Sequence, residues 1–164
     1  MEHKKIKIEM SMSDKIVEVL SVIFLLLIFF LPQYYFNDLP AKIPIHFGIS
    51  GQPDNYGGKA LIWLLPVISL FFYLGFTLLK RMPHILNYPV RISPDKTKEQ
   101  YQIAVRLLRY LLLVILAAML YLVYSTINVA LQHWQGIGSM SLILFIVLIL
   151  LILFIFIKRM VKLK

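Results

Sequence analysis

Two residues of this sequence, His46 and Asp54, carry side chains that could form an ion pair, a hydrogen bond or two ligands of a metal ion. Gly48, Gly51 and Pro53 lie between them, and all three are residue types that favour tight turns. We therefore expect the chain to reverse here and to bring the imidazole and the carboxylate together. Structural hydrogen bonding is the first interpretation, and binding of a ligand or a metal ion is the alternative.

A metal centre or a catalytic site needs more groups than this pair supplies. His133 is only a speculative third ligand, and two ligands do not make a metal site. The chain has no cysteine, which excludes a thiolate zinc site and a cysteine nucleophile. No nucleophile–base pair stands out either. We therefore predict no enzyme activity, no cofactor, no catalytic residue and no metal site.

The composition identifies the environment in which this pair is placed. Apolar residues make up 60% of the 164 residues, whereas charged residues make up only 15%. A soluble domain carries about 25% charged residues, so this chain cannot cover itself with a polar surface. The sequence therefore predicts an all-α integral membrane protein.

Four apolar runs are long enough to cross a bilayer core of about 30 Å. They cover residues 16–36, 60–79, 107–131 and 139–157. We divide the chain into a basic N-terminus (1–15), a membrane domain (16–131) and a C-terminal part (132–164) with the fourth span and a basic tail. Within the membrane domain, residues 37–59 form an outer loop, and residues 80–106 form an inner loop with a helical stub from residue 94.

The orientation follows from the basic residues. If the N-terminus, the inner loop and the tail share one side, that side holds 15 of the 17 Lys and Arg. Short loops rich in Lys and Arg remain in the cytoplasm, so we predict an N-in, C-in protein. The cytoplasmic face would contact anionic lipid headgroups. Because every basic cluster borders a span, we do not expect nucleic acid as a partner.

The outer loop is predicted to be a compact extracytoplasmic cap. Its turn motif consists of Pro44, Gly48, Gly51, Pro53, Gly57 and Gly58. The third span places polar residues on one stripe of its outer half. We expect this stripe to close the cap from below around a shallow pocket. The proposed ligand-binding residues are His46, Asp54, Asn55, Tyr124, Asn128 and Gln132.

The inner loop contains a helix start at Ser93 and Pro94, so the third helix should run unbroken from about Pro94 to about Leu131. Arg106 and Arg109 share a face where this helix enters the membrane and could reach lipid phosphates. We expect lipid anchoring here, with a cytoplasmic or membrane partner as the alternative. The inner-loop motif residues are Asn87, Tyr88, Pro89, Tyr101, Arg106 and Arg109.

The outer-loop motif, from Leu39-Pro40 through Pro44-Ile45-His46-Phe47 to Gly51-Gln52-Pro53-Asp54, resembles the bacterial membrane domain of unknown function numbered 1648. The same domain opens the SdpI-like immunity proteins, which protect bacteria against a secreted peptide toxin. Those proteins carry a further membrane region after this domain, whereas only one hydrophobic helix follows the third span here.

The resemblance implies a non-enzymatic multi-pass protein of the bacterial cytoplasmic membrane. Immunity to, or sensing of, a peptide toxin or envelope ligand at the cell surface is the leading hypothesis. The alternatives are a transporter or channel-like accessory subunit, and a small metal-binding membrane protein that uses His46 and Asp54.

Overall fold

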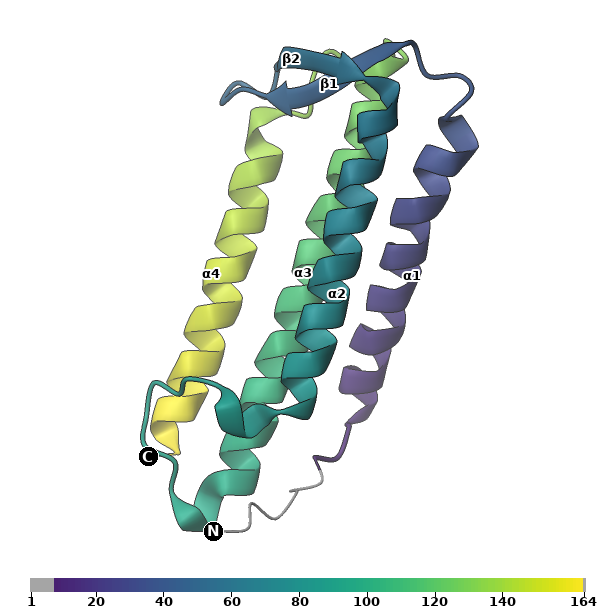
Figure 1. Ribbon diagram of the computed structural model, residues 1–164. Helices are drawn as coiled ribbons and strands as arrows, with labels where there is room; N and C mark the ends of the chain where they lie inside the picture. The colour runs from purple at the N-terminus through teal and green to yellow at the C-terminus, as the bar shows by residue number, and fades with distance from the viewer. Residues whose placement is uncertain (1–7, 164) are drawn as a thin grey trace.

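The computed structural model describes residues 8–163 and is mostly helical. Four long helices lie side by side, and a β-hairpin lies across one end of them (Figure 1). The helices are α1 (Met12–Tyr35), α2 (Leu64–Arg81), α3 (Thr97–Ala130) and α4 (Ser139–Lys162). The hairpin pairs β1 (Lys42–Phe47) with β2 (Pro53–Gly58). Short 3₁₀ turns occupy Lys59–Trp63, Pro83–Ile85 and Pro94–Lys96.

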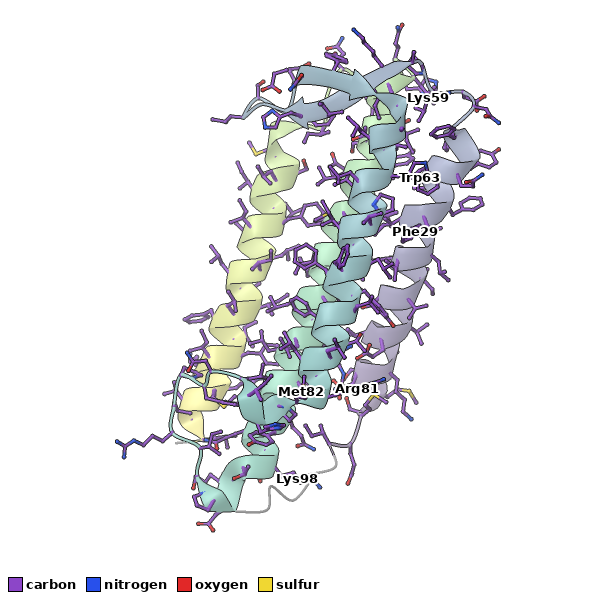
Figure 2. The ribbon with its side chains drawn as sticks, viewed as in Figure 1. Phe29, Lys59, Trp63, Arg81, Met82 and Lys98 are labelled. Atoms are coloured by element: carbon purple, nitrogen blue, oxygen red, sulfur yellow. The ribbon has the colours of Figure 1, made fainter. Side chains whose placement is uncertain are left out.

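All four helices are long and apolar enough to cross a membrane. The start of α1 and the end of α4 lie at the same end of the bundle, opposite the hairpin (Figure 1). We call these two ends of the bundle the terminal end and the hairpin end. Figure 2 shows Lys59 and Trp63 at the hairpin end, and Arg81 and Lys98 at the terminal end. The structure thus has the four apolar helices that the sequence predicts.

The expectation of an all-α chain is wrong in one element, because the outer loop contains the β-hairpin. Pro44 and the alternating apolar residues beside it hold β1 extended. The turn formers then let β2 return antiparallel to it. The loop is therefore a small two-stranded sheet.

Helix ends differ from the predicted spans by several residues. The first helix starts at Met12 because Ser11 and Asp14 form a capping box: Ser11 Oγ accepts from the Asp14 N–H, and the Asp14 carboxylate accepts from the Ser11 N–H. The second becomes α-helical only at Leu64, after a 3₁₀ turn. The third has no break between residues 100 and 107.

Helix α3 is the centre of the bundle, since α1, α2 and α4 all pack against it. Its buried Leu112, Leu116, Val123 and Ile127 form the middle of the core together with Ile28 of α1. The same core continues at the hairpin end, where it includes Leu39, Ile43 and Ile62. The hairpin is thus packed onto the bundle.

Candidate functional site

The hairpin brings His46 and Asp54 together through two irregularities in its register. Pro44 pairs with Tyr56 and His46 with Asn55, so one extra residue, Ile45, lies on β1. Asp54 is the matching extra residue on β2, because Phe47 pairs with Pro53. Such bulges re-aim side chains. His46 Nδ1 lies 2.5 Å from Asp54 Oδ1, as the turn motif predicts.

The turn leaves little room beside this pair. The Gly48 N–H donates to the Gln52 carbonyl at 2.9 Å, and the Gly51 N–H donates to the Gly48 carbonyl at 2.8 Å. Gly51 has a φ of +78°, which favours glycine. A Cβ on Gly48 would lie 3.2 Å from Asp54 Oδ2. A side chain at position 48 would therefore crowd the carboxylate.

Two contacts tie the hairpin to the bundle. Near the tip, the Ile137 N–H donates to the Gly51 carbonyl at 2.8 Å. At the other end, Lys59 Nζ donates to the Phe36 carbonyl at 3.1 Å, at the C-terminus of α1, and lies 4.8 Å from the centre of the Phe36 ring. A cation is favourable at that end of a helix. The tip and the base of the hairpin are thus held to different parts of the bundle.

A cavity of about 380 Å³ lies beneath β1, between α2, α3 and the start of α4. Such a volume is within the usual range for small-molecule sites. His46 and Thr126 are its polar lining residues. Its other lining residues are Ile43, Pro44, Ile45, Phe47, Leu61, Ile62, Leu64, Leu65, Leu122, Ile137 and Leu142. The cavity therefore suits an apolar group with a polar atom near His46.

The polar stripe of α3 does not close this cavity, which corrects the predicted pocket. Tyr124 is exposed and packs edge-on against Trp134. The Asn128 amide donates to the Tyr124 carbonyl, and Gln132, at φ +62°, is exposed. The cavity meets α3 at Leu122 and Thr126 instead, on a different face of the helix.

Asn55, the third ligand-binding residue predicted in the outer loop, does not belong to the cavity either. Asn55 accepts the N–H of Tyr56 at its own side-chain oxygen and is not a lining residue. Among residues 8–163, no three His, Asp or Glu side chains are placed to hold a metal ion. His133 is therefore not a third ligand for His46 and Asp54. The pair remains an exposed one, with 67% and 51% of the two side chains accessible.

At the terminal end, the inner-loop motif folds back onto the bundle. The rings of Tyr88 and Tyr101 stack with centroids 5.7 Å apart, and the Tyr88 hydroxyl donates to the Pro83 carbonyl at 2.8 Å. Burial raises the pKa of the Tyr88 phenol, so it stays a neutral donor. Asn87, Tyr88 and Pro89 line a cavity of about 160 Å³ against α3 and α4. Asn87, Tyr88 and Pro89 therefore lie against α3 and α4 at this end of the bundle.

The start of α3 is fixed by a residue whose role the sequence did not reveal. Gln100 is fully buried, and its amide oxygen accepts the Ser93 N–H at 3.0 Å while its nitrogen donates to the Arg91 carbonyl at 3.2 Å. The Ser93 side chain makes no capping bond. The inner loop is thus held to α3 by a glutamine one turn inside the helix.

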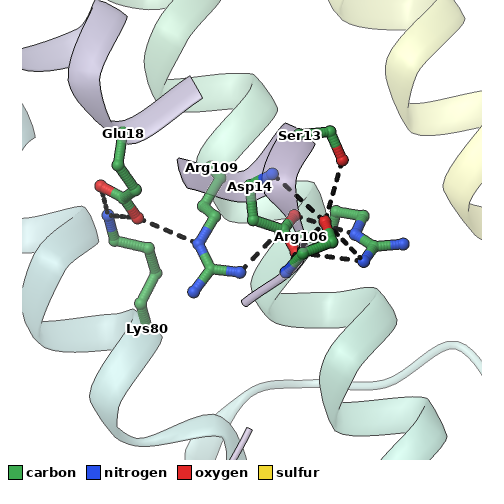
Figure 3. Close-up of polar contacts among 7 residues, drawn as sticks. Ser13, Asp14, Glu18, Lys80, Arg106 and Arg109 are labelled. Carbon is green, nitrogen blue, oxygen red and sulfur yellow. Dashed lines mark hydrogen bonds and ion pairs between the residues drawn. The ribbon is translucent and has the colours of Figure 1, made fainter. Parts of the chain in front are cut away.

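A five-residue charge cluster joins α1, α2 and α3 at the terminal end (Figure 3). It contains Asp14 and Glu18 of α1, Lys80 of α2, and Arg106 and Arg109 of α3. The sequence expectation that Arg106 and Arg109 extend to lipid phosphates is wrong, because both arginines pair with carboxylates of α1.

The contacts of the cluster connect every charge to another helix. Arg106 donates from Nε and Nη2 to both oxygens of Asp14, at 2.9 and 3.0 Å. Arg109 donates from Nε to Glu18 at 3.0 Å and has Nη1 3.7 Å from Asp14. Lys80 donates to both oxygens of Glu18, at 2.6 and 2.8 Å. The Asp14 side chain is only 1% exposed, and those of Lys80 and Arg109 are 8% exposed.

The spacing of the charges was the available signal for this cluster. Asp14 and Glu18 are four residues apart, and Arg106 and Arg109 are three apart, so each pair shares one helix face. Charges in a bundle need partners, and these two faces carry opposite signs. The capping box starts α1 at Met12, before the predicted span. Asp14 is therefore inside the helix and lies on the same helix face as Glu18.

These features define a multi-pass membrane protein in which a hairpin covers one end of a helical bundle. Residues 23–70 match the model of the family described as "Domain of unknown function (DUF1648)", which confirms the resemblance for this segment. The matched segment runs from α1 through the hairpin into α2.

One relative is similar to part of this chain, and its description names no activity. The chain is 32% identical over 78 residues to an uncharacterized protein of Archaeoglobus fulgidus. The aligned part covers 43% of this chain and 43% of the relative, so the chain spans less than half of that protein's length. No solved structure matches.

Proposed function

We propose that this protein is a non-enzymatic receptor in the bacterial cytoplasmic membrane that binds a membrane-active peptide at its hairpin end. The cavity beneath the His46–Asp54 pair is the observation that carries the proposal. An apolar side chain of the peptide would enter the cavity, and a polar group of the peptide would meet the exposed pair. The immunity function implied by the family resemblance has the same ligand class.

The hairpin favours a peptide over other envelope ligands. A sheet of only two strands has an outer edge on each strand where backbone groups lack a strand partner. An extended peptide can add to such an edge by main-chain hydrogen bonds, while pockets select its side chains.

The orientation that this function requires is N-in and C-in, with the hairpin outside. The basic residues near the terminal end support it. Because the chain has no cysteine, single cysteines can report it. S50C and Q135C in intact cells should react with an impermeant thiol reagent, whereas K98C should react only after lysis. Labelling of K98C in intact cells would reverse the orientation and exclude an extracellular peptide site.

The cytoplasmic face is proposed to contact anionic lipids through the tail. Lys158, Arg159 and Lys162 end α4, outside the charge cluster. Arg106 and Arg109 no longer belong to this surface, since they pair with α1.

Survival of cells challenged with membrane-active peptides tests the binding site. Leu142 lines the cavity near the start of α4, and its neighbour Ile143 does not; both are exposed to the surroundings of the bundle. In cells that lack the native protein, L142W should lose protection, and the matched variant I143W should keep it. H46A should also reduce protection. Equal protection by L142W and I143W, at equal protein levels, would exclude the cavity as the peptide site.

A further inference from the structure

The tip of the hairpin presents an isoleucine that the fold leaves uncovered. Ile49 is 99% exposed, whereas Gly51, two residues later, is buried. A single exposed apolar residue needs no explanation on a protein surface in water. What matters for Ile49 is its height along the bundle, because a membrane surrounds these helices.

The height of the tip is set by its bond to the linker before α4. Ile137 donates to the Gly51 carbonyl, and Gly136 lies so close that a Cβ there would be 2.3 Å from the same carbonyl oxygen. The apolar span formed by α4 runs from Met140 to Lys162, so it begins three residues after Ile137. The tip is therefore held close to the level at which α4 enters the hydrocarbon.

That level falls in the interfacial layer. The hydrocarbon core is about 30 Å thick, and the headgroup regions bring the total to about 40 to 45 Å, which leaves several ångströms of interface on each side. Three residues of chain can span no more than about 11 Å, and less where the chain is coiled. Figure 1 shows the β1–β2 turn beside the start of α4, at the edge of the bundle.

We propose that the hairpin tip is an interfacial membrane contact in which Ile49 inserts into the boundary between lipid headgroups and acyl chains beside α4. The surrounding Ser50 and Gln52 are exposed and polar, and they suit the headgroup level. Apolar groups of interfacial segments enter this boundary by about 5 to 10 Å. The contact requires no ligand in the cavity, so it stands independently of the peptide-binding proposal.

Site-directed spin labelling in vesicles of phosphatidylcholine and phosphatidylglycerol tests this contact. The cysteine-free chain allows single nitroxides at I49C, at N55C on β2 and at L150C on the exposed face of α4. Collision rates with oxygen, which concentrates in the bilayer, and with a water-soluble nickel complex give the depth of each label. Spin-labelled lipids calibrate the phosphate level.

We expect the label at position 49 to lie at or just below the phosphate level, deeper than the label at 55 and shallower than that at 150. Collision rates at 49 equal to those at 55, with free access of the nickel complex, would place the tip in water and overturn the proposal. Protection of position 49 from both reagents would also overturn it, because it would show a protein contact in place of lipid. Because Ile49 is almost fully exposed, the I49C substitution removes no packing within the chain.

Discussion

The charge cluster makes a prediction about asymmetry: removing Glu18 should cost much more stability than removing Lys80. Glu18 accepts hydrogen bonds from Lys80 and Arg109, and the side chains of both cations are 8% exposed. E18Q would leave Lys80 with no carboxylate partner, and Arg109 would keep only Asp14, 3.7 Å from its Nη1. K80M would leave Glu18 bonded to Arg109 and would keep an apolar stem in place of the lysine chain. It would also reduce the excess of three cations over two anions in the cluster.

The magnitude follows from the burial of the partners. Breaking a buried ion pair by removing one partner costs about 3 to 5 kcal/mol. The Glu18 side chain is 26% exposed, which allows water to relax the site, so the lower end applies and E18Q should cost about 3 kcal/mol. K80M should cost about 1 kcal/mol, which is the net value of an ordinary hydrogen bond. The double variant should be more stable than E18Q alone, because it removes the cation that E18Q leaves without a carboxylate partner.

Unfolding by titration with sodium dodecyl sulfate from dodecylmaltoside micelles, followed by circular dichroism, measures these differences. E9Q is the matched control: Glu9 pairs with Lys98 at 3.4 Å, but both side chains are exposed, so the change should be close to zero. An E18Q variant no less stable than K80M, or a double variant less stable than E18Q, would refute the view that stranded charges dominate the energetics of the cluster.

Three further predictions use the same unfolding measurement. G136A should cost about 2 kcal/mol, because its Cβ would overlap the Gly51 carbonyl. The control G75A should be neutral or stabilising, because nothing lies within 4 Å of a Cβ there. Equal effects of the two substitutions would contradict the tight contact between the linker and the tip. K59M should cost about 1 to 2 kcal/mol, because it removes the bonds to two carbonyls after α1, and an unchanged stability would show that water replaces the ammonium there. D54N should change stability by less than about 1 kcal/mol because its partner is exposed; a larger loss would show that the pair is a structural element of the hairpin.

What the sequence predicts well in this chain is local. The four apolar runs identify the helices because the length of each run is set by the bilayer and needs no knowledge of neighbours. His46 and Asp54 are eight residues apart, and the turn formers between them lead the chain back over that short distance. The continuity of α3 is equally local, since residues 97–130 contain neither Pro nor Gly.

What the sequence does not predict depends on how the helices rotate about their axes. Asp14 and Arg106 are 92 residues apart, and their contact exists only because α1 and α3 turn these faces toward each other. Because the sequence does not give this rotation, a charge near the end of a span is equally consistent with a contact to lipid headgroups. The prediction that the polar stripe of α3 closes the cavity is wrong for the same reason: its residues share one face of α3, but the cavity lies against another face.

The two ends of the bundle restrain the helices differently, and this bears on which wall of the cavity can move. At the terminal end, charges connect α1, α2 and α3, while none of the five cluster residues belongs to α4. At that end α4 packs through apolar and ring contacts such as Tyr110 with Phe156. Its linker is held at the hairpin end, where the Tyr121 hydroxyl and the Gly51 carbonyl both bond to Ile137. Moving α2 or α3 relative to α1 requires separating buried charges, whereas tilting α4 about Ile137 separates mainly apolar surface, which lipid chains can cover in its place. A ligand that needs a wider cavity should therefore displace α4 first.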